Sequence, residues 1–328
     1  MGTEDPKTAQ SRQSGPVRRL GSLVLLGLVT ACAPARVERP VSWSAIAEAP
    51  RPAPDHVLFY GDAPQQFGEL WLPAGDGPFP VVILLHGGCW LSDYDIGYMA
   101  RAAADLADRG LAVWSLEYRR VGDIGGGWPG TFQDVARGAD HLRALADHHP
   151  VDLERVVLAG HSAGGHLALW LASRQKFPLE TRVSIDNPLP VHGVVALAGI
   201  ADLSAYSDGG GGCNQAVIPL MGGAPGEVPR RYDEADPLRR LPTGIPTRFI
   251  QGALDPIVPP EQPLRYTERA KARGDDAGTQ IVDGEGHFDV ADPASASWAA
   301  ALGAIEEILY LKAPVDPARG YGREKEHE

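Results

Sequence analysis

The feature that most constrains the fold is an alternation between short apolar runs and segments with helical periodicity. Strands are expected at 80–85, 111–116, 155–159, 194–198, 247–251 and 280–282, after an antiparallel pair at 57–60 and 69–72. Helices are expected at 98–109, 132–147, 163–174, 261–273 and 295–311. A continuous apolar run such as PVVILL at 80–85 indicates a strand that is buried on both faces. Strands that alternate with helices form parallel sheets through right-handed crossovers. The sequence therefore predicts an α/β protein with a mostly parallel central sheet flanked by helices.

One stretch interrupts this alternation, at about 202–245, where four consecutive glycines and several prolines occur. Because parallel α/β sheets bind ligands outside the carboxyl ends of their strands, we expect this insertion to lie near the binding site. The catalytic domain is expected at 56–312. A tether rich in Pro and Ala precedes it at 32–55, and a polar tail follows it at 313–328.

The N-terminal segment is expected to direct the chain to its location. After Arg18 and Arg19 comes an apolar run at 20–31, which is too short to span a bilayer and is typical of a secretory signal. The residues Val-Thr-Ala-Cys at 29–32 resemble the lipobox of bacterial lipoproteins. That resemblance implies a signal peptide at 1–31, an acylated Cys32, and an exported protein anchored to a membrane on the periplasmic side or at the cell surface. The alternatives are an ordinary cleaved signal and a short buried helix.

Charge and motif content exclude several classes of protein. The net charge of −12 argues against a nucleic-acid partner. Three cysteines cannot form a disulfide scaffold, and neither CxxC nor HExxH occurs, so no metal is expected. His161 and His166 are interpreted as packing residues, because a catalytic zinc needs three protein ligands.

The segment Gly-His-Ser-Ala-Gly at 160–164 is the most informative motif. It follows the apolar run RVVLA and precedes the helical pattern AGGHLALWLASR, which is the strand–turn–helix context of a nucleophile elbow. Such a turn exposes the serine hydroxyl above the sheet. Ser162 is therefore the candidate nucleophile, and the alternative is an inert serine in a glycine-rich turn.

A serine hydroxyl needs a base to attack at neutral pH. His287 follows the last expected strand, and Asp255 follows the strand expected at 247–251. The chain order Ser162, Asp255, His287 is that of the α/β-hydrolase triad. His287 is expected to act as base and then acid, and Asp255 is expected to orient it. Asp289 and Asp292 are competing candidates for the acid, disfavoured because they lie so close to His287 in sequence.

The motif His-Gly-Gly-Cys-Trp at 86–90 directly follows the strand expected at 80–85. In lipases and esterases the loop at this place and the residue after the nucleophile supply N–H groups for the oxyanion. The expected donors are Gly87, Gly88 and Ala163, with Cys89 as a further candidate. His86 is expected to hold the loop.

Two tryptophans are candidates for the substrate pocket. Trp90 either forms a wall of the acyl pocket or packs in the core, and Trp128 lies in a segment where substrate specificity is expected.

These motifs together resemble the α/β-hydrolase superfamily, and within it the branch of small esterases and kynurenine formamidase-like enzymes. HGGCW matches the HGGxW of that branch, GHSAGGHLA matches its elbow, and ALDPIVP and GEGHF match its acid and base segments. The resemblance covers about 57–311. It implies the α/β-hydrolase fold and cleavage of a small-molecule ester or amide through an acyl-enzyme, with no cofactor.

Three functions are carried forward. The first is a carboxylesterase for small or medium acyl chains. The second is an aryl formamidase, and the third is a catalytically silent binding protein on the same fold. One further question stays open: Cys89 and Cys213 either form a disulfide in an oxidising compartment or remain free thiols.

Overall fold

A computed structural model describes residues 40–174, 182–183 and 186–310. Its central feature is one eight-stranded sheet with the strand order β1-β2-β4-β3-β5-β6-β7-β8. The strands β3 to β8 pair in parallel, and β1 and β2 form the antiparallel edge. The strands are β1 (His56–Phe59), β2 (Phe67–Trp71), β3 (Phe79–Leu85), β4 (Ala112–Leu116), β5 (Val151–His161), β6 (Gly193–Leu197), β7 (Thr247–Gly252) and β8 (Ala277–Val282). This confirms the expected α/β class and the mostly parallel sheet.

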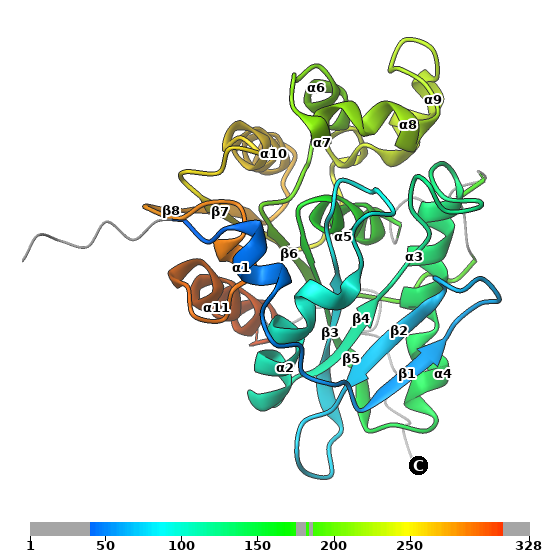
Figure 1. Ribbon diagram of the computed structural model, residues 1–328, viewed down its shortest axis with the longest axis vertical. Coiled ribbons are helices and arrows are strands. Elements are labelled where there is room, and N and C mark those ends of the chain that lie inside the picture. The colour runs from blue at the N-terminus through cyan, green and yellow to red at the C-terminus, as the bar shows by residue number, and fades with distance from the viewer. Residues whose placement is uncertain (1–39, 175–181, 184–185, 311–328) are drawn as a thin grey trace, which may run out of the picture. The chain divides into compact units, whose positions relative to one another are not determined.

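Helices cover both faces of the sheet (Figure 1). One apolar cluster joins α2 (Ala100–Asp108) and α11 (Ala296–Tyr310) to one face. A second cluster joins α3 (Gly130–Asp140), α4 (Leu142–Ala146), α5 (Ala163–Ser173) and α10 (Glu261–Lys271) to the other. The strand β3 shows why both clusters form. Its side chains alternate between them, with Ile83 in one and Val82 in the other, so the apolar run at 80–85 is buried on both faces.

Two of the expected helices are divided. The segment at 132–147 forms α3 and α4, separated by His141. The segment at 98–109 begins earlier, as the short 3₁₀ helix η1 (Ile96–Met99), and continues as α2. The side chain of Asp95 caps η1 by accepting a hydrogen bond from the N–H of Gly97. This cap accounts for the earlier start, because it satisfies a free N–H at the helix end.

The insertion at 202–245 connects β6 to β7. It forms α6 (Leu203–Ser207), α7 (Gly212–Gln215), α8 (Val217–Met221), α9 (Pro229–Ala235) and η2 (Pro237–Arg240). These helices gather beyond the carboxyl ends of the central strands (Figure 1). A last short helix, η3 (Asp289–Ala291), lies between β8 and α11.

The expected tether is partly ordered secondary structure. Within 32–55, residues Trp43–Ala47 form the short helix α1, and its Ile46 is buried in the cluster that contains α2 and α11. The lipobox with Cys32 and the C-terminal tail lie outside the described residues. Among the helices that the structure describes, none has the length and apolar character needed to cross a bilayer.

Candidate active site

The candidate nucleophile lies on a sharp turn between β5 and α5. Ser162 has φ 55° and ψ −117°, a backbone conformation that few residues other than glycine adopt. Two glycines allow the turn, because a Cβ on Gly160 would approach the carbonyl oxygen of Gly164 to 2.3 Å and one on Gly164 would meet that of His86 at 2.3 Å. The elbow expected from the sequence is therefore present. Strain of this kind persists only where the surrounding structure enforces it.

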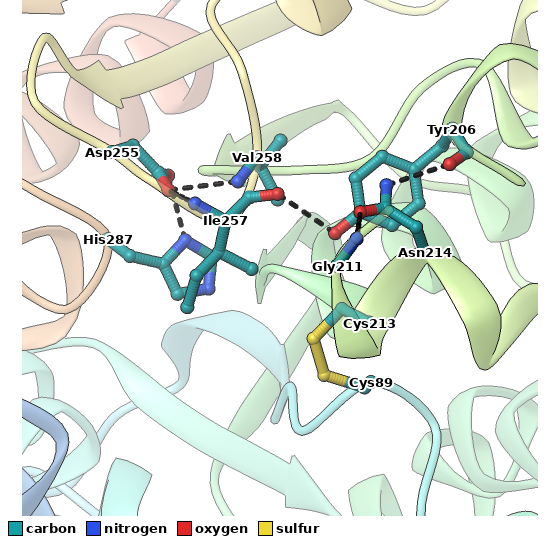
Figure 2. The surroundings of a disulfide bond; sticks show 9 residues. All are labelled: Cys89, Tyr206, Gly211, Cys213, Asn214, Asp255, Ile257, Val258 and His287. Atoms are coloured by element: carbon teal, nitrogen blue, oxygen red, sulfur yellow. Dashed lines mark hydrogen bonds and ion pairs between the residues drawn. A yellow bond between two sulfur atoms is a disulfide. The ribbon is translucent and has the colours of Figure 1, made fainter. Parts of the chain in front are cut away.

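The base and the acid lie beside each other. His287 Nδ1 and Asp255 Oδ2 are 2.7 Å apart, and both side chains are almost fully buried (Figure 2). Asp255 Oδ1 accepts hydrogen bonds from the N–H groups of Ile257 and Val258. Burial alone would raise the pKa of Asp255, but the bond to His287 and these two N–H groups lower it overall. Asp255 is thus an ionised partner that fixes the orientation of His287.

The competing carboxylate Asp289 has a different role. Its Oδ2 accepts hydrogen bonds from the N–H groups of Gly286 and Val41. It therefore holds the backbone of the loop that carries His287, next to the N-terminal segment.

Ser162 and His287 line the same cavity of about 300 Å³, beyond the carboxyl ends of β5 and β8. The cavity is lined mainly by apolar and aromatic groups: Trp43, Gly88, Cys89, Tyr94, Tyr98, His161, Cys213, Ile257 and Phe288 surround the two catalytic candidates. A lining of this kind has a low dielectric constant, which strengthens the electrostatic interactions within the cavity.

The structure changes the expected set of oxyanion donors. The N–H of Gly87 donates to the hydroxyl of Tyr98 at 2.5 Å, so it is not free to bind an oxyanion. Within the described part of the chain, the N–H groups of Gly88, Cys89 and Ala163 have no hydrogen-bond acceptor. The available donors are therefore Gly88, Cys89 and Ala163. On the loop, the available donors are thus Gly88 and Cys89, whereas Gly87 and Gly88 were expected.

Buried polar contacts hold the loop at 86–90, which we call the oxyanion loop. His86 Nε2 lies 3.0 Å from Glu117 Oε1, and the hydroxyl of Tyr118 donates to the carbonyl of His86 at 2.7 Å. Burial acts to raise the pKa of Glu117, but His86 and Arg120 lower it overall. His86 thus holds the loop, as expected from the sequence.

A second set of hydrogen bonds joins the oxyanion loop to the loop that carries His287, which we call the histidine loop. The hydroxyl of Tyr98, which accepts from Gly87, lies 2.8 Å from His161 Nδ1. His161 Nε2 lies 2.9 Å from the carbonyl oxygen of His287. Because a carbonyl can only accept, Nε2 carries the proton and Nδ1 accepts from Tyr98. Burial lowers the pKa of His161 to about 3, so the ring stays uncharged at neutral pH.

A disulfide connects the oxyanion loop to the insertion (Figure 2). Cys89 is bonded to Cys213 of α7, with their Cα atoms 4.9 Å apart. This separation lies in the usual range for disulfides. Of the two states left open by the sequence, the bridged one is found.

Neither tryptophan proposed for the pocket lines the cavity of Ser162 and His287. Trp90 is fully buried in the core, and its Nε1–H donates to His166 Nδ1 at 3.2 Å. Trp128 packs against Phe132 with ring centroids 5.2 Å apart. Trp90 belongs to the apolar core, and Trp128 is partly buried against it.

His166 is a packing residue. Its Nδ1 accepts from Trp90, and its Nε2 lies 3.0 Å from the carbonyl of Ala235. Burial lowers its pKa to about 4. No group of three or more potential metal ligands from His, Cys, Asp and Glu occurs among residues 40–174, 182–183 and 186–310.

Sequence reasoning missed Tyr98, Trp43 and the role of Asp289. Tyr98 begins an expected helix, where an aromatic residue is usually a core residue. Trp43 lies in the expected tether. No local pattern indicates that either one reaches the site.

The fold and this Ser–His–Asp arrangement define an α/β-hydrolase. The family model described as BD-FAE matches residues 69–269, which is more than half of the chain. The chain therefore belongs to this family of α/β-hydrolase esterases.

Known proteins agree with that assignment. Esterase LipC of Mycobacterium tuberculosis is 27% identical over 250 residues, which are 72% of this chain and 60% of LipC. The kynurenine formamidase of Danio rerio is 29% identical over 152 residues, which are 45% of this chain and 47% of that protein. The chain thus spans less than two thirds of the length of either relative. A solved structure described as a truncated form of a carbohydrate esterase from gut microbiota shares the fold, with a TM-score of 0.67 and 20% identity. It covers 83% of this chain and 99% of that one.

Proposed function

We propose that this protein is a serine carboxylesterase that cleaves small or medium acyl esters through an acyl-enzyme. The observation that carries the proposal is the meeting of three features in one cavity. A nucleophile elbow presents Ser162, a buried Asp255 orients His287, and the adjacent loop and the start of α5 carry N–H groups that have no acceptor among the described residues. Family membership supports the same activity.

The reaction follows from this arrangement. Ser162 Oγ attacks the ester carbonyl while His287 Nε2 takes its proton, and Asp255 stabilises the resulting imidazolium. The negative charge moves to the carbonyl oxygen, where the N–H groups of Gly88, Cys89 and Ala163 stabilise it. The tetrahedral intermediate then collapses, and His287 protonates the departing alcohol. Water attacks the acyl-enzyme by the same steps, releases the carboxylic acid and restores Ser162.

The dimensions of the cavity support a small or medium substrate. Its volume of about 300 Å³ is at the lower end of the range for ligand pockets. The lining by Trp43, Ile257 and Phe288 favours an uncharged ester over a charged one.

Aryl formamidase activity is the second candidate. The kynurenine formamidase of Danio rerio is similar over 45% of this chain. The aromatic rings of Trp43, Tyr94 and Phe288 offer flat surfaces to a planar aryl group. The same triad would attack the formyl carbon.

The proposed location of the protein rests on the lipobox-like segment that ends at Cys32. We propose that Cys32 carries the lipid, so that the catalytic domain works outside the cytoplasm at a membrane surface. A disulfide between Cys89 and Cys213 supports an oxidising compartment. Labelling of cells with a radioactive fatty acid tests this, with Cys32→Ala expected to abolish the label.

The activity is tested by hydrolysis of p-nitrophenyl acetate and N-formylkynurenine by the wild type and by Ser162→Ala. We expect ester turnover that falls by several orders of magnitude in the variant, with an unchanged circular dichroism spectrum. Ester turnover that persists in Ser162→Ala would refute the mechanism. Formamide turnover alone would favour the second candidate. A folded wild type that neither turns over substrate nor reacts with a fluorophosphonate would indicate the silent binding protein.

A further inference from the structure

Two neighbouring cavities share three aromatic lining residues. The first is the catalytic cavity of about 300 Å³, and the second has a volume of about 240 Å³. Both are lined by Trp43, Tyr94 and Tyr98, whereas Ser162 and His287 line only the first. These three rings therefore border both cavities, and we refer to them as the aromatic wall.

Trp43 is the centre of this wall. Its ring centroid lies 5.1 Å from that of Tyr94, 5.3 Å from that of Tyr98 and 5.6 Å from that of Phe288, the residue after the catalytic histidine. The contacts with both tyrosines are edge-to-face, which is a favourable geometry for aromatic pairs. The wall is thus closed by packing between a short N-terminal helix and two loops of the active site.

The helix that carries Trp43 is fixed to the site at both ends. Before the helix, the N–H of Val41 donates to Asp289, which also holds the loop of His287. Ser42 caps the first turn through the N–H of Ala45, and Ile46 is buried in the core. Trp43 is therefore placed by several independent contacts, and its position does not depend on ring packing alone.

Trp43 lies outside the residues that match the family model, which begin at residue 69. From these observations we propose that Trp43 determines substrate specificity by closing one end of the catalytic cavity and so limiting the length of the ester. The inference rests on the esterase activity proposed above. It goes beyond that activity by assigning the length limit to one residue.

Removal of the indole would join the two cavities. The second cavity continues past Trp43 to Ile46, Ala49 and Pro50, with charged groups from Arg51, Asp93, Asp95 and Arg101 at its surface. A longer chain could then extend beyond the present wall along the apolar side of that cavity. A methylene that a pocket accepts or refuses changes kcat/KM by about 10–200-fold, so the effect should be large.

The test measures kcat/KM for two ester series, using full-length Trp43→Ala, Trp43→Phe and the wild type. One series is p-nitrophenyl acetate to decanoate, and the other is ethyl to octyl acetate. In at least one series, we expect Trp43→Ala to raise the ratio of the longest to the shortest ester by tenfold or more. Trp43→Phe should fall between it and the wild type. Ser44→Ala, on the exposed side of the same helix, is the matched control and should keep the wild-type ratio.

The outcomes separate this inference from the proposed function. If Trp43→Ala hydrolyses the shortest ester but keeps the wild-type ratios in both series, Trp43 is not the length limit. If Trp43→Ala does not fold, Trp43→Phe decides, because a phenyl ring keeps the packing while shortening the wall. Its ratios must then exceed those of Ser44→Ala, and equal ratios overturn the inference. Absence of turnover in the wild type would instead refute the esterase activity and this inference with it.

Discussion

The hydroxyl of Tyr98 and the ring of His161 together link the oxyanion loop to the loop that carries His287. The hydroxyl accepts from the N–H of Gly87 and donates to His161, whose other ring nitrogen donates to the carbonyl of His287. Tyr98→Phe removes this hydroxyl and leaves the ring in place. The variant therefore tests whether the link positions the catalytic groups.

The effect on stability follows from the two groups that lose their partner. Gly87 and His161 are both buried, so removal of the hydroxyl leaves the N–H of Gly87 and Nδ1 of His161 without their hydrogen-bond partner. Leaving one buried polar group unsatisfied costs about 1–3 kcal/mol. The two groups together predict that the free energy of unfolding falls by about 2–6 kcal/mol.

The effect on catalysis follows from the place of Gly87 in the loop. Gly87 directly precedes Gly88 and Cys89, whose N–H groups are the candidate oxyanion donors. Loss of one such donor lowers kcat by about 10²–10³-fold. In Tyr98→Phe the loop keeps its donors but loses the hydrogen bond that holds Gly87. We therefore expect a smaller decrease in kcat, of about 10–100-fold, with KM nearly unchanged.

The assays are urea unfolding and p-nitrophenyl acetate hydrolysis between pH 6 and 9. Because the pKa of His161 is lowered to about 3, the link does not titrate in this range. The ratio of wild-type to variant kcat should therefore be independent of pH. Tyr232→Phe is the control, since the hydroxyl of Tyr232 donates to the carbonyl of Gly223 within the insertion, and Tyr232 is not among the residues that line the cavity of Ser162. This control variant should be less stable than the wild type but should keep the wild-type kcat. If Tyr98→Phe has the stability and kcat of the wild type, the positioning role is refuted.

Three further predictions concern the acid, a buried carboxyl and the disulfide. Asp255→Asn should lower kcat by about 10³–10⁴-fold at constant KM, because His287 would lose the partner that fixes its tautomer; an undiminished steady-state kcat would contradict this. Burial, together with the charge of Asp202, raises the pKa of Asp236 from 3.8 to about 6. Its ionisation therefore opposes folding: its contribution is complete below pH 3.8, and about 3 kcal/mol of stability is lost as the pH rises through 6. Thermal unfolding of Asp236→Asn against the wild type should show a difference that grows in favour of the variant from pH 4 to 7, and a constant difference would count against it. Cys213→Ser should lower the free energy of unfolding by about 2–4 kcal/mol, because the bond to Cys89 closes a loop across 124 positions; equal urea midpoints for the two proteins would show that the bond adds no stability.

The sheet and the candidate triad could both be predicted from the sequence because both depend on local patterns. The structure confirms the sheet and pairs Asp255 with His287, and the catalytic role of Ser162 stays a prediction. Apolar runs such as 80–85 specify buried strands by themselves. Ser162, Asp255 and His287 each follow a strand of the parallel part of the sheet, β5, β7 and β8, which places them at one edge of that sheet. The pairing of Asp255 with His287 at 2.7 Å agrees with that placement. These predictions required no knowledge of which side chains meet.

Predictions that depend on where an N–H group or a side chain points were less successful. Glycine at positions 87 and 88 indicates a close approach of the loop, but it does not say which N–H points into the cavity. That is decided by Tyr98, which lies eleven positions further along and takes the N–H of Gly87. Trp90 and Trp128 were similar: an aromatic residue near a catalytic motif can face either the cavity or the core, and here both pack away from the cavity.

The walls of the cavity come from parts of the chain with little periodicity, which explains both what the sequence missed and how specificity can vary in such a fold. Trp43 comes from the N-terminal segment and Cys213 from the insertion, and both line the cavity beside Ser162. Neither segment contributes a strand to the sheet, so changes in either one can reshape the cavity without disturbing the elbow or the pair of Asp255 and His287. The N-terminal segment is nevertheless tied to the histidine loop through Asp289, so its helix must be seated for the wall to form. Selectivity between short and long esters should therefore depend on contacts of residues 41–46, whereas the attack on the ester depends on the residues at the strand ends.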